Sequence, residues 1–257
     1  MIGLVVVSHS PALAHAAVDL ALQMVPGEKP AIAIAAGAGD GLIGTDAAVV
    51  SAAIDEVASA DGVLVIMDLG SAVMSAEMAL DFRSSQTEVR LSSAPFVEGL
   101  LAAIVTAAGG ASLADVDREA RGALAPKIQL LGEPEPVLAD PVAHLAPLAP
   151  PTTLAPLTTL APLTPEELRA DLVIVNADGL HARPAATLVS TLAGFDARLT
   201  VVNQRTPRAP VAANSLIGLL SLGAKSGDVL TVAATGRQAA QALARVTAMV
   251  NDGFGEL

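Results

Sequence analysis

The chain has 257 residues, of which 53% are hydrophobic, 2% aromatic and 16% charged, and its formal net charge is −12. Because it contains no cysteine, a disulfide framework, a cysteine-based zinc site and a thiol nucleophile are excluded. The negative charge argues against a nucleic-acid partner, whose phosphates it would repel. No run approaches the roughly 20 apolar residues of a membrane-spanning helix, so we expect a cytoplasmic protein with no membrane partner.

The first 133 residues alternate between short apolar runs and segments with helical spacing. This alternation predicts an α/β doubly wound parallel sheet with both faces covered by helices. In chain order we expect a strand over 2–7, a helix over 10–24, a strand over 31–36, a helix over 45–58 capped by Thr45, a strand over 62–67, a helix over 71–82, a strand over 88–91, helices over 95–107 and 113–124, and a final strand over 127–131.

A change of composition separates this domain, over 1–133, from the rest of the chain. Residues 134–168 lack Lys and Arg and are rich in proline, and the hexapeptide TTLAPL over 152–157 is repeated over 158–163. Proline fixes φ and removes a backbone donor, so the composition predicts a semi-rigid linker. The formal charge is strongly negative before the linker and slightly positive after it, which is compatible with docking of the two domains.

The second domain, over 169–257, is built differently. Its order of elements predicts a C-terminal α+β open-faced sandwich, with a small antiparallel sheet and helices on one side. We expect a strand over 172–176, a helix over 182–193, strands over 199–203 and 209–212, a helix over 215–222, a strand over 229–233 and a helix over 237–250.

A candidate site lies where the strands of the first domain end. His9 directly follows the first strand, and ligands of doubly wound sheets bind outside the carboxyl ends of the strands. Two turns open on the same edge; they offer Gly39, Gly41 and Ser71 as phosphate-binding groups. Asp68 is expected to orient the imidazole of His9. From spacing alone, a purely structural role of His9 as a helix cap stays equally open.

A second candidate site lies at the start of a helix in the second domain. His181 stands just before the first turn, which Pro184 marks, and the helix dipole there favours a phosphoryl group. Arg183 brings a planar donor fork for phosphate oxygens. The alternative is a capping histidine beside a surface arginine. His15 falls in the middle of a helix and His144 in the linker, so neither is chosen.

Two motifs of the second domain resemble the histidine phosphocarrier family, HPr, of the bacterial phosphotransferase system. They are GLHARPAA over 179–186 and NSLIGLLSLGAKSGD over 214–228. The first domain is similar to mannose-family enzyme IIA, most closely to the DhaM family of phosphoryl-donor subunits, through VVVSHS over 5–10, GLIGT over 41–45 and MDLGSAVMSAEMA over 67–79. The resemblance implies that His181 and His9 both carry a phosphoryl group.

The resemblance further implies a homodimer through the first domain. Its interface could be formed by Ile104, Val105, Leu113 and Leu124, although an intramolecular core explains their apolar character equally well. Ser215 stands where some family members carry a regulatory phosphorylation site, whereas the residues themselves predict a helix N-cap.

The function implied is a phosphohistidine relay. A separate enzyme I, needed because the chain stops after the HPr-like domain, charges His181, and the group passes through His9 to an ADP-bearing DhaL subunit that supports the dihydroxyacetone-binding DhaK subunit. No cofactor or metal is expected, and a separate HPr could also charge His9. The alternatives are a sugar-transporting enzyme IIA–HPr fusion, a regulatory binding module, and a metal-dependent hydrolase using His9, His15 and Asp68.

Overall fold

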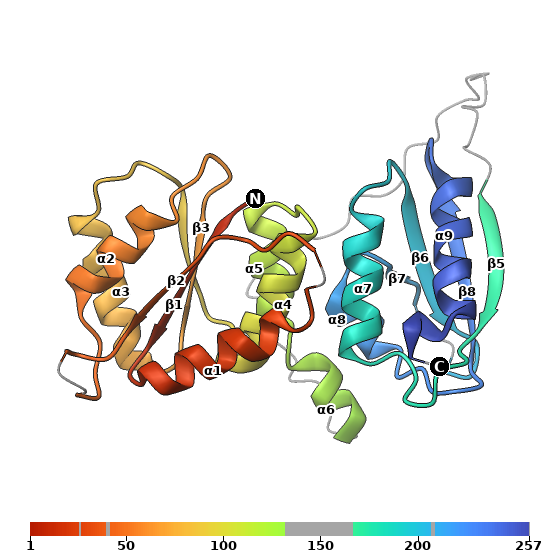
Figure 1. The fold of residues 1–257 in the computed structure, drawn as a ribbon, viewed down its shortest axis with the longest axis horizontal. Helices are drawn as coiled ribbons and strands as arrows, with labels where there is room; N and C mark the ends of the chain where they lie inside the picture. The colour runs from red at the N-terminus through yellow and green to blue at the C-terminus, as the bar shows by residue number, and fades with distance from the viewer. Residues whose placement is uncertain (26, 40–41, 132–166, 207–208, 257) are drawn as a thin grey trace, which may run out of the picture.

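The computed structural model describes the chain except residues 26, 40–41, 132–166, 207–208 and 257 (Figure 1). The predicted linker therefore lies almost wholly outside the described residues, as does His144. Four strands of the first domain form a parallel sheet in the order β2-β1-β3-β4. The strands are β1 (Gly3–Ser8), β2 (Ile32–Ala36), β3 (Val63–Met67) and β4 (Val89–Ser92).

Helices cover both faces of this sheet, which confirms the doubly wound fold. On one face, the apolar side chains of β1 and β3 pack in one cluster with α1 (Pro11–Leu22), α4 (Phe96–Ala108) and α5 (Leu113–Arg121). On the other face, the alternate side chains of these strands pack with α2 (Ala47–Glu56) and α3 (Gly70–Phe82). The two central strands are buried from both sides, as their continuous apolar runs predict.

Two predictions for the first domain were wrong. Residues 127–131 form a helix, α6 (Ala125–Leu131), rather than a strand. Pro126 lies in its first turn, where the fixed φ of proline suits a helix. The cap of α2 is Asp46, not Thr45: the Asp46 carboxylate accepts from the N–H of Ala48 at 2.8 Å. The hydroxyl of Thr45 instead lies 2.7 Å from the Ser75 hydroxyl on α3.

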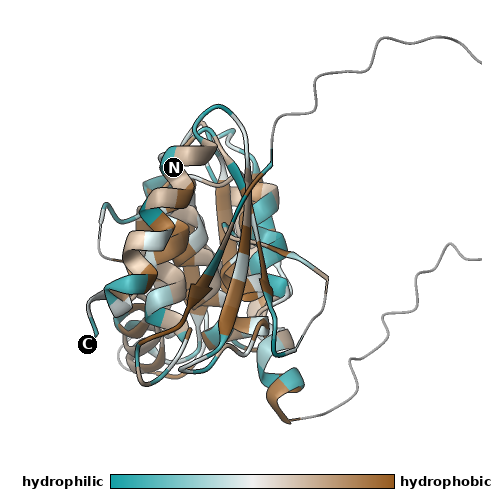
Figure 2. Cartoon of the chain, turned by 90° about the vertical axis from the view of Figure 1, so that its right-hand side faces the viewer, coloured by the Kyte–Doolittle hydropathy of each residue, from teal (hydrophilic) through white to brown (hydrophobic). Residues whose placement is uncertain are grey.

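The second domain is the predicted open-faced sandwich. Its antiparallel sheet has the order β5-β8-β6-β7, and the alternating burial of β6 and β8 shows that one face is covered. Seen from the side of the second domain, hydrophobic residues run along the strands (Figure 2). The elements are β5 (Leu168–Val173), α7 (Ala182–Leu192), β6 (Arg198–Asn203), β7 (Val211–Ala212), α8 (Leu216–Ser221), β8 (Val229–Thr235), α9 (Ala239–Asn251) and a 3-10 turn, η1 (Gly253–Gly255).

Two strand boundaries differ from the prediction. The first strand of this domain begins at Leu168, because β5 pairs with β8 along its whole length from Leu168 to Val173. The short β7 contains only Val211 and Ala212, which pair with β6. In the described part of the chain, no helix has the length and apolar character to cross a membrane.

The two domains touch through their helices. α7 and α8 pack against α4, and α8 also packs against α6. Buried residues of both domains belong to a single apolar cluster, which includes Val105 of the first domain and Val189 of the second.

Candidate functional site

His9 lies in the turn between β1 and α1, at the carboxyl edge of the parallel sheet. Because β1 and β3 are neighbours, Asp68 at the end of β3 reaches this turn. Asp68 Oδ2 accepts from the backbone N–H of His9 at 2.8 Å and from the hydroxyl of Ser8 at 2.9 Å. Asp68 Oδ1 lies 2.9 Å from His9 Nδ1. An ionised carboxylate can only accept, so this contact assigns the ring proton to Nδ1.

The surroundings of Asp68 keep its carboxyl group ionised. Partial burial raises its pKa, but the hydrogen bonds from the backbone and ring of His9, from Ser8 and from the N–H of Leu69 outweigh burial. The net effect is a pKa below the ordinary value of 3.8. At neutral pH the carboxylate therefore holds the imidazole in one orientation and in one tautomer.

The other ring nitrogen of His9 faces the start of a helix. Nε2 lies 2.8 Å from the hydroxyl of Ser71, which stands in the first turn of α3. With the proton on Nδ1, Nε2 carries the lone pair and accepts from Ser71. The first N–H groups of a helix have no intrahelical partner, and the dipole is positive at this end. Nε2 thus points a nucleophilic lone pair at a place that suits phosphate oxygens.

The glycine-rich turn borders His9 through the backbone. The N–H of Gly37 donates to Ser8 O, and the N–H of Gly44 donates to His9 O, both at 3.1 Å. Gly39 has φ +84° and its carbonyl accepts from Leu42, so it shapes this turn. Gly41 lies outside the described residues, and phosphate binding by either glycine stays a prediction.

His181 is the N-cap of α7. Its Nε2 lies 2.9 Å from Glu256 Oε2, which assigns the ring proton to Nε2 and leaves the lone pair on Nδ1. Arg183 is exposed in the first turn of α7, two residues from His181. In that turn the backbone N–H groups of Ala182 and Arg183 have no intrahelical partner, and Pro184 has none to offer.

The position of His181 depends on a tight turn at Gly179. It has φ +70°, and a Cβ there would lie 2.3 Å from the carbonyl oxygen of Ala224, so only glycine fits. The close approach lets the N–H of Leu180 donate to the same carbonyl at 2.9 Å. The second motif of the HPr resemblance, which contains Ala224, is therefore packed directly under the histidine turn.

Glu256 is the site residue that sequence reasoning missed. It follows η1 near the end of the chain, and the amide of the buried Asn176 contacts both Gly179 O, at 2.6 Å, and Glu256 Oε2, at 3.4 Å. The only local signal is an acidic residue after the Gly-Phe-Gly turn, where Phe254 has φ +58°. Nothing in that signal indicates a partner 75 residues away.

Two further histidine and serine predictions can be placed. His15 is exposed on α1. Ser215 caps α8: its hydroxyl oxygen accepts from the N–H of Gly218 at 2.9 Å, and its O–H donates to Glu119 Oε2 of the first domain at 2.8 Å.

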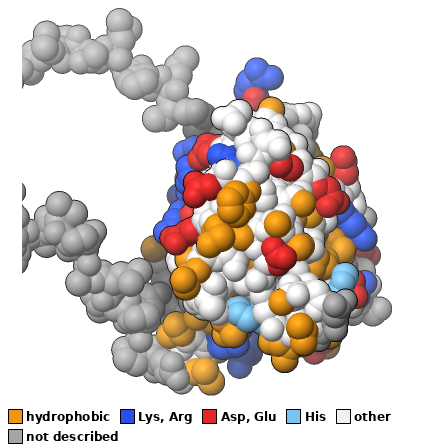
Figure 3. All heavy atoms as spheres, turned by 90° about the vertical axis from the view of Figure 1, so that its left-hand side faces the viewer, with side chains coloured by type: hydrophobic (Ala, Val, Ile, Leu, Met, Phe, Trp, Pro, Cys, Tyr) orange, Lys and Arg blue, Asp and Glu red, His pale blue; other side chains and the backbone are white. Residues whose placement is uncertain are grey.

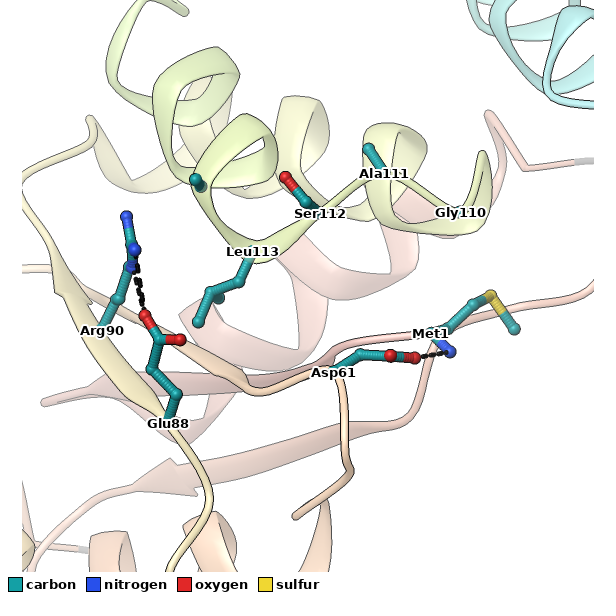
Figure 4. A pocket seen from close by; sticks show the side chains of 9 residues that line it. Met1, Asp61, Glu88, Arg90, Gly110, Ala111, Ser112 and Leu113 are labelled. Atoms are coloured by element: carbon teal, nitrogen blue, oxygen red, sulfur yellow. Dashed lines mark hydrogen bonds and ion pairs between the residues drawn. The ribbon is translucent and has the colours of Figure 1, made fainter.

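A pocket of about 480 Å³, lined by Met1, Asp61, Glu88 and Arg90 (Figure 4), lies at the amino-terminal edge of the parallel sheet, away from His9.

Comparisons with known proteins assign both domains. Residues 3–117 match the family model EIIA-man, described as the fructose IIA component of the phosphotransferase system, and residues 168–252 match the HPr component phosphorylation site. Over 83 residues the chain is 45% identical to the phosphocarrier protein NPr of Escherichia coli, of which it covers 90%.

Similarity to DhaM extends over the whole chain. The chain is 40% identical, over 260 and 261 residues, to the phosphoryl donor subunits DhaM of the PEP-dependent dihydroxyacetone kinases of Klebsiella michiganensis and Escherichia coli. It spans 51% of the length of each of these relatives. The chain thus belongs to the phosphotransferase-system family, as a fusion of an EIIA-man domain with an HPr domain.

Proposed function

We propose that the chain is the phosphoryl-donor subunit of a phosphotransferase-dependent dihydroxyacetone kinase, acting in the cytoplasm. Enzyme I charges His181, the group passes to His9, and from there it goes to ADP on a DhaL subunit that serves DhaK. The observation that carries the proposal is common to both domains: a carboxylate holds one nitrogen of a histidine that lies at the start of a helix, and the other nitrogen is left with its lone pair. Similarity of the whole chain to about half the length of the DhaM proteins supports the choice of dihydroxyacetone kinase.

The transfer step needs no proton to change place. In phosphorylated His181 the PO₃ group is on Nδ1, and Nε2–H donates to Glu256, which stabilises the imidazolium. The lone pair on His9 Nε2 attacks phosphorus in line; the new P–N bond forms as the old one breaks, and the bonding pair returns to His181 Nδ1. His9 then becomes the imidazolium, with its Nδ1–H held by Asp68. Catalysis consists of positioning and charge stabilisation.

Phosphate oxygens would find similar donors at both sites. At His9 they would take hydrogen bonds from Ser71 and the first turn of α3, and at His181 from the first turn of α7 and from Arg183. We assign Asp68 as the orienting group, and we propose Gly39 and Gly41 as further phosphate-binding residues. Similar surroundings keep the free energies of the two phosphohistidines close, which suits a relay.

An apolar stripe beside His9 suits protein partners. α3 begins at the His9 ring and exposes Met74, Met78 and Phe82, which are 70%, 53% and 60% exposed, and Leu69 and Ile43 stand out nearby. Hydrophobic side chains gather on this face of the first domain (Figure 3). Exposed apolar patches mark protein interaction sites, so phosphoryl donors and acceptors would be docked as proteins, or a second copy would pair here as a homodimer. Of the residues first considered for a dimer interface, Ile104, Val105 and Leu113 are buried within the chain and only Leu124 is exposed.

The experiment uses purified chain with phosphoenolpyruvate, enzyme I, DhaL, DhaK and dihydroxyacetone. The native chain should gain two acid-labile phosphoryl groups by intact mass and yield dihydroxyacetone phosphate. His9→Ala and His181→Ala should each abolish product, and a free HPr should rescue only His181→Ala. His15→Ala is the matched control and should behave as native. Phosphorylation without DhaL-dependent product would contradict the kinase assignment and favour a sugar-transport or regulatory role.

A further inference from the structure

The contact between the two domains is built from apolar surface. α7 and α8 of the second domain lie on α4 and α6 of the first. The C-terminal ends of α4 and α5 lie close to the second domain. A methyl group on Gly109 would lie 3.6 Å from Val189 Cγ1 of α7, and one on Gly122 would lie 3.9 Å from Ile217 Cγ2 of α8. Both glycines are helix C-caps, so they let the two helical layers meet without an intervening side chain.

One carboxylate ties the contact together. Glu119 projects from α5, and its Oε2 accepts from the hydroxyl of Ser215 at 2.8 Å and from the N–H of Ile217 at 3.4 Å. Beside it lies a cleft of about 990 Å³ lined by residues of both domains, polar ones such as Arg118 and Arg198 and apolar ones such as Phe195. An interface that such a cleft leaves open at its rim is typical of domains that can separate.

The second domain lies on the side of the parallel sheet opposite to the one that His9 Nε2 faces, so this contact does not allow transfer to His9. His9 Nε2 faces α3, which packs on one face of the sheet with α2. The second domain lies against α4, which packs on the opposite face. Figure 1 accordingly shows α2 and α3 at the end of the first domain that is remote from the second domain, with the parallel sheet and α4 between them and α7. Phosphoryl transfer requires the reacting atoms to be about 3–3.5 Å apart.

We propose that this contact is a closed resting state, in which Glu119 latches the α7–α8 face of the second domain and keeps His181 away from His9. That the latch governs transfer rests on the proposed relay; that the contact forms does not. Release of the second domain exposes the α7–α8 face and frees His181, at the start of α7, to approach His9. The occupant of the α4–α6 surface is therefore the second domain of the same chain.

The test uses the full chain, whose lack of cysteine leaves introduced thiols as the only ones. Gly122→Cys with Ile217→Cys should form a disulfide within one chain on mild oxidation, at micromolar concentration. Gly122→Cys with Val173→Cys on β5 is the control pair and should react about tenfold more slowly, since β5 is not part of the contact. Disulfides between chains would assign the surface to a second copy, and equal rates for the two pairs would remove the contact; either overturns the proposal.

The latch is tested in the same background. Adding Glu119→Ala should slow disulfide formation about fivefold, whereas Glu56→Ala, an exposed carboxylate on α2, should leave it unchanged. An unchanged rate with Glu119→Ala overturns the latch.

Transfer supplies the last readout. Cross-linked by oxidation first and then charged on His181 with phosphoenolpyruvate and enzyme I, the chain should fail to label its own His9, and labelling should recover on reduction. Undiminished transfer while cross-linked would overturn the resting state. If the reduced chain labels neither histidine, the proposed function fails, and cross-linking alone decides the contact.

Discussion

A carboxylate contacts each of the two histidines, but through a different ring nitrogen. Asp68 binds Nδ1 of His9 and leaves Nε2, whereas Glu256 binds Nε2 of His181 and leaves Nδ1. The side chain of His9 is 17% exposed and that of His181 is 38% exposed. The His9 site is assembled from neighbouring strand ends, and the His181 site from a helix start and the end of the chain.

The comparison shows what the two sites need in common. In each, the carboxylate fixes the tautomer of a histidine that lies at the start of a helix. The more enclosed site is attached to the more firmly packed scaffold, because β1 and β3 are buried on both faces. The more open site fits the proposed role of His181 as a carrier that meets more than one partner.

The largest effect is expected from Asp68→Ala. Without the carboxylate, His9 loses its fixed tautomer and orientation, and transfer from phosphorylated His181 should slow between about 10²- and 10⁴-fold. Quenched-flow labelling followed by intact mass measures the rate. Asp81→Ala, an exposed carboxylate on α3, is the control. Native-like transfer by Asp68→Ala would break the analogy between the two carboxylates.

Gly179→Ala should destabilise the second domain by about 3 kcal/mol or more, because the new methyl group would collide with the carbonyl of Ala224. Gly227→Ala separates strain from collision. Gly227 has φ +83° but open space around it, so the cost should be about 1 kcal/mol. Urea denaturation monitored by circular dichroism measures both. Equal losses would show that the packing under His181 is loose.

The contribution of Asp228 to the stability of the second domain should depend on pH. Its hydrogen bond with Arg205 at 2.6 Å lowers its pKa to about 2, with further help from Lys225 N–H and Asn203. Because the folded pKa is depressed, the stabilisation is present above the ordinary pKa of 3.8 and is lost as pH falls toward 2.

Asp228→Asn should therefore cost about 2 kcal/mol at pH 7 and flatten the loss of stability between these pH values. Thermal unfolding measured across this pH range checks both effects. An acid profile identical to that of the native chain would contradict the assignment.

Glu256→Ala should slow transfer from His181 about tenfold, the effect of one charge-assisted hydrogen bond of about 1.5 kcal/mol. The nitrogen-15 shifts of His181 should lose their Nε2–H pattern, a readout that a purely structural role would not move. Asp252→Asn, exposed at the end of α9, is the control. If the tautomer is unchanged, Glu256 does not position the ring.

Ser71→Ala should have the smallest effect, about threefold on transfer to His9, because the backbone N–H groups of α3 remain. Ser75→Ala, one turn further along α3, removes a hydroxyl that lies beside Thr45 instead, and it should leave transfer unchanged. A loss as large as that of Asp68→Ala would make Ser71 the main support of the acceptor.

The His9 site could be predicted from the sequence because strands and helices alternate regularly along the first domain. Parallel strands bring their carboxyl ends to one edge, so His9 and Asp68 could be placed together from strand order alone. Glu256 could not be placed, because no local pattern relates a residue near the chain end to His181. The domain contact through Glu119 and Ser215 likewise depends on tertiary packing rather than on either segment.

The local errors have local causes. Thr45 and Asp46 are both good N-caps, and only the position of the helix axis decides between them. Residues 127–131 form too short a run for helical and strand periodicity to differ. At Leu168 the pairing with β8, which no sequence pattern reports, extends the strand.

The most direct test of the account is the phosphorylated chain in nitrogen-15 and phosphorus-31 NMR. The account predicts phosphorus on Nδ1 of His181 when His9 is replaced by alanine, and on Nε2 of His9 in the chain charged through both. Phosphorus on the nitrogen that faces Asp68 or Glu256, or on neither ring, would contradict it.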